Sequence, residues 1–362
     1  MNPRHAGSKS GLIPDLSMSR RQVLALAGTT ALIASGLSTG TYAQSATPRN
    51  MANDFAGHVD IGGRALYVES AGDGSPTVVL EAGLLGRSDV WSRDQHFPPG
   101  EREMVFPAAA RFTHVVAYDR PGTIGEVNSS LDPSAPLFYP SRSDPVPQPR
   151  TIADAAEDLN AMLLAAAVPP PYVLVGHSMG GMIVRLFANL HPENVVGMVL
   201  VDATTENINV EFERALPPAV WAEFDAFSAG GNPELLAAYP DYERLKQGPL
   251  LEDPSYSILR DAQIANPLQP MPLVVLSHGI PFPAPLPEWP IETMEDVMAA
   301  QQAWLATIVP DARHIIASKS GHNIHQDQPE LVIQAIRDVV DAVRDPSTWT
   351  PATPVANAST PS

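Results

Sequence analysis

Residues 172–181 read Tyr172-Val173-Leu174-Val175-Gly176-His177-Ser178-Met179-Gly180-Gly181, and this stretch says more about the fold than any other part of the 362-residue chain. Its first four residues form an apolar run typical of a strand buried on both faces, and a helical pattern continues to Leu190. Between them lies G-x-S-x-G, in which a serine occupies a strained strand-to-helix turn and the glycines make room for that turn. We therefore predict that Ser178 exposes its hydroxyl at the carboxyl end of a buried strand, beside the positive N-terminus of a helix.

Short apolar runs alternate with helical patterns on both sides of this stretch. The alternation predicts an α/β fold, a mainly parallel sheet with helices on both faces. The predicted strands are Arg64–Glu69, Thr77–Leu80, His114–Tyr118, Tyr172–Val175, Val196–Val201, Leu273–Leu276 and Arg313–Ala317. The predicted helices are Ile152–Ala166, Gly181–Leu190, Ile291–Ile308 and Pro329–Val343.

One connection in this pattern is much longer than the others, because about 70 residues separate Val201 from Leu273. Residues 204–269 within it are rich in aromatic residues, leucine and alanine. The larger side chains are Phe212, Trp221, Phe224, Phe227, Tyr239, Tyr242, Leu245 and Tyr256. We predict that this insertion is a helical cap over one end of the sheet, where open α/β sheets bind their ligands, and not an inert surface loop.

With a strand before G-x-S-x-G and a helix after it, the sequence resembles the α/β-hydrolase superfamily over residues 56–344. The resemblance implies the α/β-hydrolase fold, with a mainly parallel central sheet flanked by helices. It makes Val196–Val201 the sixth strand and Leu273–Leu276 the seventh, so the cap is inserted after the sixth strand. Residues 53–344 are then one catalytic domain that includes the cap.

The resemblance also implies an oxyanion hole built from two backbone N–H groups. Residues 78–86 resemble the family's strand and glycine-containing loop, and Leu84 is the expected donor there. Met179, which follows the serine, is the second expected donor. Ala82-Gly83 stands where the family often has His-Gly, but the donors are backbone groups and do not depend on that side chain. Asp119-Arg120-Pro121-Gly122 is similar to the family's D-R-x-G turn, so we expect a structural role for Asp119 and Arg120.

A reactive serine needs a base, and family order places it after the last strand. Ser320-Gly321-His322 follows Arg313–Ala317, so the resemblance implies His322 as the base. His325 in the same loop is the alternative. The two form an H-x-x-H pair, yet no further cluster with metal-ligand spacing accompanies it, and we expect no metal site. His177 adjoins the serine in sequence, but its side chain is expected to point away from the serine Oγ.

The acid that orients the base has more than one candidate. No carboxylate follows Leu273–Leu276 at the usual distance, and Glu288 is the first one, in a proline-rich loop. Asp202 instead closes the strand Val196–Val201, at a second location that some family members use. We favour Asp202, with Glu288 as the alternative and Glu206 as a further candidate. The structural alternative for Asp202 is that it only caps its strand.

These residues imply a serine hydrolase that cleaves a carboxylic ester through an acyl-enzyme on Ser178. The expected partner is a small hydrophobic ester, and no cofactor is needed. An amidase or aminopeptidase, a lactonase and a cofactor-free perhydrolase remain open on the same residues. A non-catalytic binding protein with this fold is the remote alternative. No G-x-x-x-x-G-K-[ST] or G-x-G-x-x-G pattern indicates a phosphate-binding loop.

Composition narrows the classes of partner. The chain carries 22 Lys+Arg against 40 Asp+Glu, a net charge of −18, which disfavours binding to nucleic acid or to an anionic membrane surface. Cysteine is absent, so disulfides, zinc-thiolate sites and thiol nucleophiles are excluded. Apolar residues make up 44% and charged residues 17%, which is typical of a globular protein.

The two ends of the chain differ from the middle. Residues 1–43 contain Ser19-Arg20-Arg21, an apolar run from Val23 to about Gly36 and Thr41-Tyr42-Ala43, and so resemble a cleavable twin-arginine signal peptide. We expect the twin-arginine export machinery as a partner, a periplasmic or secreted location, and no stable membrane insertion once the signal is removed. Residues 44–52 are expected to be a linker and residues 345–362 a disordered tail. Without the leader, 18 basic and 39 acidic residues remain, and the net charge of −21 disfavours anionic substrates.

Overall fold

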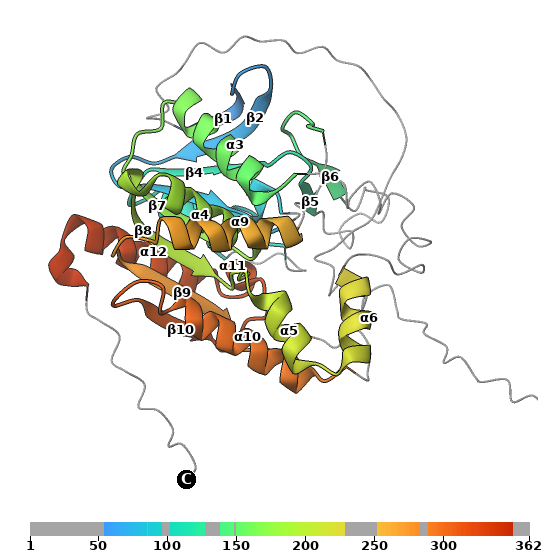
Figure 1. The fold of residues 1–362 in the computed structure, drawn as a ribbon. Helices are drawn as coiled ribbons and strands as arrows, with labels where there is room; N and C mark the ends of the chain where they lie inside the picture. The colour runs from blue at the N-terminus through green and yellow to red at the C-terminus, as the bar shows by residue number, and fades with distance from the viewer. Residues whose placement is uncertain are drawn as a thin grey trace, which may run out of the picture.

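The computed structural model describes residues 54–84, 86–95, 102–126, 138–147, 150–228, 252–282 and 289–349. Eight strands form one sheet in the order β1-β2-β4-β3-β7-β8-β9-β10 (Figure 1). Their bounds are β1 (Phe55–Asp60), β2 (Ala65–Ala71), β3 (Thr77–Glu81), β4 (Val115–Tyr118), β7 (Tyr172–His177), β8 (Val195–Val201), β9 (Leu273–His278) and β10 (Arg313–Ala317). From β4 to β10 every neighbouring pair is parallel, and only β1 and β2 run antiparallel to their neighbours. The predicted α/β-hydrolase architecture is confirmed.

Helices cover both faces of the sheet because its parallel strands are apolar on both faces. On one face, leucines and valines such as Leu174 pack against α3 (Ile152–Ala165), α4 (Met179–Leu190) and α10 (Ile291–Leu305). On the other face, their sequence neighbours such as Val175 pack against α2 (Val105–Ala109) and α12 (Pro329–Arg344). Successive strand residues alternate between these two cores, which fixes the register of every central strand. The carboxyl ends of β7, β8, β9 and β10 therefore meet at one edge.

The long insertion follows β8, the sixth strand of the sheet in chain order, as predicted. Its described part contains α5 (Ile208–Ala215), α6 (Pro218–Ser228) and α9 (Glu252–Ala265). The Phe224 ring lies 5.0 Å from the Phe212 ring and 5.5 Å from the Trp289 ring, between centroids, and this group packs against the start of α10. Tyr256 of α9 is buried against α4. Several of the aromatic residues therefore anchor the insertion to the sheet's helices, while Tyr239, Tyr242 and Leu245 lie outside the described residues.

The structure adds elements that the sequence pattern does not predict. They are β1, a two-stranded sheet of β5 (Ile124–Glu126) and β6 (Phe138–Pro140), the helix α11 (Ile324–Asp327), and the short 3-10 helices η1 (Ser88–Trp91), η2 (Pro192–Asn194) and η3 (Pro346–Thr348). The helix α2 is a further addition. All are short or lie at the edge of the sheet, where burial is partial and leaves a weak apolar pattern.

The packed chain also extends beyond residue 344, the predicted end of the catalytic domain. The Arg313 guanidinium lies 3.9 Å from the centroid of the Trp349 ring, and the Trp349 indole N–H donates to the carbonyl of Asp311 at 3.1 Å. The prediction that the tail begins at Asp345 is therefore wrong for its first five residues, because one tryptophan gives this segment an apolar contact. The predicted leader 1–43, the linker 44–52 and residues 350–362 lie outside the described part.

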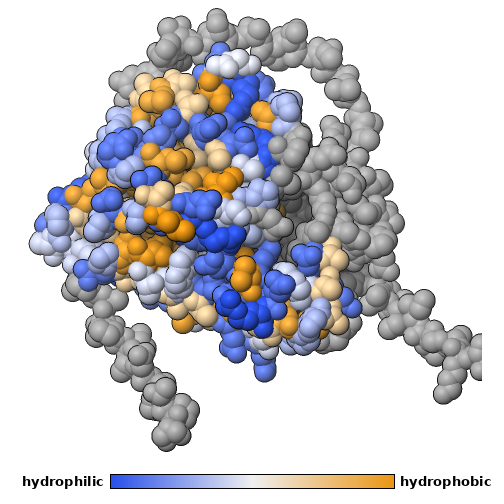
Figure 2. All heavy atoms as spheres, in the orientation of Figure 1, coloured by the Kyte–Doolittle hydropathy of each residue, from blue (hydrophilic) through white to orange (hydrophobic). Residues whose placement is uncertain are grey.

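The surface contains both hydrophilic and apolar residues (Figure 2). Figure 2 shows apolar residues interspersed with hydrophilic ones over the face that carries α9 and α10. In the part of the chain that the structure describes, no helix is both long enough and apolar enough to cross a membrane.

Candidate active site

Ser178 occupies the turn between β7 and α4. Its backbone has φ 52° and ψ −125°, a strained conformation for a residue other than glycine, and α4 begins at the next residue, Met179. The turn is tight because Gly176 and Gly180 almost touch: a Cβ on Gly176 would lie 2.6 Å from the Gly180 carbonyl oxygen. A Cβ on Gly180 would in turn lie 2.5 Å from the carbonyl oxygen of Ala82. Glycine is therefore required at both positions, which accounts for their spacing around the serine.

Asp202 follows β8 directly and has φ 44°, so it also stands in a left-handed turn at the same edge of the sheet. Its carboxylate is fully buried. The Nδ1 of His322, in the loop after β10, donates to Asp202 Oδ2 at 2.6 Å. Residues 120 positions apart are thus joined by a short charge-assisted hydrogen bond.

Backbone contacts place this pair beside Ser178. The serine's N–H donates to the carbonyl of Val201 at 3.1 Å, and its carbonyl accepts from Thr204 N–H at 3.0 Å, so the turn is bonded on both sides of Asp202. The next link is His177, whose ring Nε2 donates to the carbonyl of His322 at 3.0 Å. The carboxyl ends of β7 and β8 and the loop after β10 therefore hold a serine, a carboxylate and a histidine in one place.

A second histidine, which the sequence analysis does not single out, shares the Asp202 carboxylate. His278 ends β9, and its Nδ1 lies 2.8 Å from Asp202 Oδ1 and 2.9 Å from Oδ2. Its backbone N–H also donates to Oδ1, at 3.0 Å. The other ring nitrogen, Nε2, lies 2.8 Å from Oε2 of Glu295 on α10. The sequence contains one signal for the contact between His278 and Asp202, namely that His278 ends a strand neighbouring β8. It contains no signal for the contact between His278 and Glu295.

The electrostatics of this cluster keep Asp202 ionised. Burial alone would raise the pKa of Asp202, but hydrogen bonds from His278 and His322 hold it below its usual range. Burial alone would lower the pKa of His278, whereas its contacts with Asp202 and Glu295 raise it to about 9. At neutral pH the cluster thus contains an aspartate anion and a histidine cation.

Two further histidines behind the site are neutral. His177 and His325 are buried with their ring centroids 4.4 Å apart, and His325 also packs on Trp91 at 4.8 Å. Burial, with a smaller contribution from neighbouring histidines, lowers the pKa of His177 well below its ordinary value and that of His325 to about 3. Within the described residues the buried Nδ1 of His325 has no hydrogen-bond partner, whereas the Nδ1 of His322 donates to Asp202, so these two members of the H-x-x-H pair have different surroundings.

The loop after β3 packs directly on the serine turn. A Cβ added to Gly83 would lie 2.9 Å from His177 Nδ1 and 3.3 Å from the Cβ of Ser178, so only glycine fits here. Arg120 anchors the same loop from the other side. Its guanidinium donates to the backbone carbonyls of Ala82 (2.7 Å), Gly83 and Leu84 (3.1 Å), and forms a buried ion pair with Glu81. Burial raises the pKa of Glu81, which also accepts from the Tyr118 hydroxyl at 2.6 Å.

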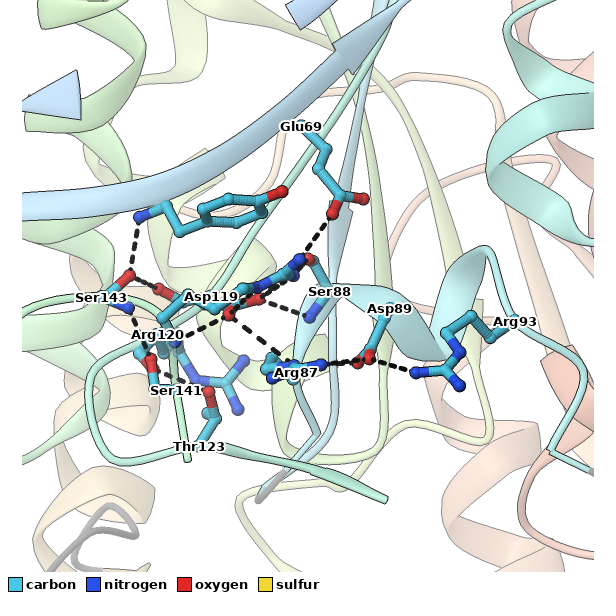
Figure 3. A network of polar contacts seen from close by, with 12 residues as sticks. Glu69, Arg87, Ser88, Asp89, Arg93, Asp119, Arg120, Thr123, Ser141 and Ser143 are labelled. Atoms are coloured by element: carbon cyan, nitrogen blue, oxygen red, sulfur yellow. Dashed lines mark hydrogen bonds and ion pairs between the residues drawn. The ribbon is translucent and has the colours of Figure 1, made fainter. Parts of the chain in front are cut away.

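Asp119 holds the next part of the loop, as Figure 3 shows. Its Oδ1 accepts from the backbone N–H and hydroxyl of Ser88, at 3.0 and 2.8 Å, and its Oδ2 accepts from the Nε of Arg142 at 2.8 Å. Burial would raise the pKa of Asp119, but these bonds lower it. Asp119 and Arg120 thus form a buried network beneath residues 82–88.

Comparison with known proteins gives independent evidence on the family. Residues 78–335 match the sequence profile of the "Alpha/beta hydrolase family". The chain belongs to the alpha/beta hydrolase family. Among curated proteins this hydrolase is similar to the Bacillus subtilis (strain 168) "Uncharacterized protein YqjL", with 27% identity over 275 residues, 74% of this chain and 85% of the relative.

Solved structures of hydrolases are also similar to it. One is titled "Est816 as an N-Acyl homoserine lactone degrading enzyme" (22% identity, TM-score 0.46, 77% of this chain and 98% of that one). Another is carboxylesterase CesB (YbfK) from Bacillus subtilis (17% identity, TM-score 0.45, 80% and 92%). At these identities the likeness concerns the fold.

The remaining acid candidates of this hydrolase differ in their surroundings. Both carboxylate oxygens of Glu206 accept from Arg185, at 2.8 and 2.9 Å, in a buried pair that ties the start of the insertion to α4. Glu288 lies outside the described residues. Within the described ranges, no group of three or more histidine, aspartate or glutamate side chains is arranged to hold a metal ion.

Proposed function

We propose that this protein is a serine hydrolase that cleaves carboxylic esters through an acyl-enzyme on Ser178. The observation that supports it most is the 2.6 Å bond between His322 Nδ1 and a buried, ionised Asp202, at the sheet edge where Ser178 stands in a strained turn. A histidine held in this way has its Nδ1 protonated and its Nε2 available as a base. In a strand-to-helix turn of this kind, the serine hydroxyl is expected to face such a base.

The proposed steps use only groups of this chain. His322 removes the hydroxyl proton of Ser178 as the Oγ attacks the ester carbonyl carbon, and Asp202 stabilises the imidazolium that forms. His322 then returns the proton to the departing alkoxide, which leaves as the alcohol. Water then attacks the acyl-enzyme carbonyl while His322 takes one of its protons, and His322 returns that proton to the leaving serine oxygen, which releases the acid and free Ser178.

The oxyanion would be bound by the N–H groups of Leu84 and Met179. Met179 is the first residue of α4, so its N–H belongs to the unpaired first turn of a helix. For Leu84 the peptide geometry supports the role. In a trans peptide the C=O and the following N–H point in opposite directions, and Arg120 binds the Gly83 C=O. The Leu84 N–H therefore points away from Arg120.

Changing Arg120 to lysine tests this role of the loop. Lysine keeps the charge but cannot bind several carbonyls with one planar group, so the Leu84 peptide loses its fixed orientation. We expect kcat for an ester to fall by about 10²-fold, the usual cost of losing one oxyanion donor, with KM within about threefold of wild type.

Arg142→Lys is the matched control. Arg142 belongs to the same network through Asp119 and Glu69 but is bonded to none of the carbonyls of residues 82–84. Both variants should unfold at a lower temperature, but only Arg120→Lys should lose kcat. Equal losses of kcat in the two variants would show that the arginines support the fold alone.

The substrate class follows from the surroundings of the site. We propose an uncharged ester with a modest hydrophobic group, because the acidic chain disfavours anions and the insertion after β8 is rich in aromatic residues. Amides and lactones react through the same steps, and they are the alternatives that a substrate panel must include.

Fluorophosphonate labelling tests the proposed nucleophile. The reagent forms a bond between phosphorus and the serine Oγ and releases fluoride, and it requires an activated serine. We expect stoichiometric labelling of the folded protein, located at Ser178 by peptide mass spectrometry. Ser178→Ala should remove the label, whereas Ser257→Ala, which changes an exposed serine of α9, should not.

Turnover then identifies the substrate class. We expect p-nitrophenyl esters of short and medium chain length to be hydrolysed, and aminoacyl anilides to be hydrolysed more slowly. Folded wild-type protein without any label on Ser178 would overturn the hydrolase proposal. Labelled protein that prefers anilides or lactones would replace the ester by one of the alternatives.

A further inference from the structure

His278 lies where both of its ring nitrogens face a carboxylate. Nδ1 is 2.8 Å from Asp202 Oδ1 and Nε2 is 2.8 Å from Glu295 Oε2, and the side chain is 5% exposed. A neutral imidazole has one N–H, so its other nitrogen would direct a lone pair at a carboxylate oxygen. Only the imidazolium donates to both carboxylates. Between two ionised carboxylates, this geometry is that of a His278 that carries two protons.

The protonated ring determines how Asp202 is oriented. One carboxylate oxygen, Oδ1, accepts from both the backbone N–H and the Nδ1–H of His278. The other oxygen, Oδ2, is directed toward His322 at 2.6 Å. Because two donors from one residue hold the carboxylate, Asp202 cannot rotate without breaking both bonds.

Glu295 in turn holds the imidazolium. Its Oε1 accepts from the backbone N–H of Phe282 at 2.9 Å, and its Oε2 accepts from His278. The Phe282 ring lies beside both histidines, with centroids 5.1 Å from His278 and 5.4 Å from His322. The titratable groups that contact the His278 ring are thus Asp202 from the end of β8 and Glu295 from α10. His322, from the loop after β10, shares the Asp202 carboxylate with it.

We propose that His278, kept protonated by Glu295, is a positioning residue that fixes the Asp202 carboxylate for His322 and supplies a positive charge on which activity depends. The inference rests on the proposed function, in which His322 is the base. It adds a fourth and a fifth residue to the reaction, neither of which contacts the reacting atoms. It also predicts that kcat falls when His278 loses its proton.

The first test measures protonation in the wild-type protein and needs no variant. With ¹⁵N-labelled histidine, both ring nitrogens of His278 should show imidazolium chemical shifts at pH 7.5, and the loss of one proton should occur near pH 9, to which the contacts raise the pKa. His278→Gln identifies the signal by its disappearance. A neutral His278 at pH 7.5 would overturn the proposal.

The second test measures kcat and KM for an ester between pH 6 and 10.5. Wild-type kcat should decline above about pH 9. In Glu295→Gln, removal of a negative charge from Nε2 destabilises the imidazolium, so the decline should move at least one pH unit lower. His278→Gln should lower kcat about 10- to 100-fold at pH 7.5, with KM within about threefold, and should lack the alkaline decline.

His314→Gln is the matched control, because His314 also lies in the sheet and bonds a serine, Ser277, at 2.8 Å, but contacts neither carboxylate. It should keep the wild-type pH profile. If wild type is labelled and active but Glu295→Gln retains the wild-type alkaline limb, the inference on His278 fails while the hydrolase proposal stands. If wild type shows neither labelling nor turnover, the proposed function itself fails.

Discussion

Alanine in place of His322 is expected to lower kcat for an ester by about 10⁶-fold, the loss that removal of the base causes in a Ser-His-Asp enzyme. Without an imidazole at this place, the proposed base for the Ser178 hydroxyl is missing, since the ring Nε2 of His177 is already bonded to the carbonyl of His322. KM should change little, because the base acts in the transition state. Stopped assays at high enzyme concentration would measure the remaining rate.

Added imidazole offers a second measurement on the same variant. The space left by the His322 ring borders the Phe282 and His177 rings, at centroid distances of 5.4 and 4.6 Å, so it can accept a free imidazole. We expect saturable recovery of activity with imidazole, which a variant that is merely misfolded would not show.

His325→Gln distinguishes the two histidines of this loop. His325 is buried against Trp91 and His177, and its lowered pKa keeps it neutral. The variant should have lower stability but a kcat within about tenfold of wild type, the smaller cost of disturbed packing. If His325→Gln were inactive and His322→Ala active, the base would be His325.

Much of the fold follows from local sequence. The apolar run Tyr172–Val175 is buried on both faces, and Gly176 and Gly180 account for the tight turn, so strand, turn and helix could be predicted from ten residues. The predicted parallel strands begin and end within two residues of those observed. Such elements are predictable because burial leaves a continuous apolar pattern. The edge strand β1, with its alternating polar residues, carries a weaker pattern.

The polar contacts of the candidate site depend on the three-dimensional arrangement. His278 is 76 residues from Asp202 in sequence. Glu295 lies on α10, and the apolar pattern of a helix predicts which residues pack against the sheet but not which polar residues form contacts. The place of Asp202 at a strand end could be predicted, because carboxyl ends of parallel strands share one edge. The sequence could not predict which histidines contact Asp202, because those contacts depend on loop conformation. In the same way, Arg120 is recognisable from sequence as structural, but its three carbonyl partners are not.

Asp202→Asn is expected to lower kcat by about 10⁴-fold while leaving KM within a few fold, because the amide forces His322 into the wrong tautomer. Asparagine has one acceptor oxygen and one donor nitrogen. His278 offers two donors to the Oδ1 position, so the amide oxygen should turn toward His278. The NH₂ group then faces His322 Nδ1, which must act as an acceptor, and the proton moves to Nε2, where it blocks removal of the serine proton.

Glu288→Gln provides the comparison that decides between the two acid candidates. If Asp202 orients the base, Glu288→Gln should retain kcat within about threefold, because Glu288 then has no part in the proton transfer. Near-normal turnover of Asp202→Asn, together with a large loss in Glu288→Gln, would assign the acid to Glu288. The pKa of Asp202 is held below its usual range, so wild type should not lose activity through protonation of this carboxylate between pH 5 and 8. Asp202→Asn should be slow at every pH in that window.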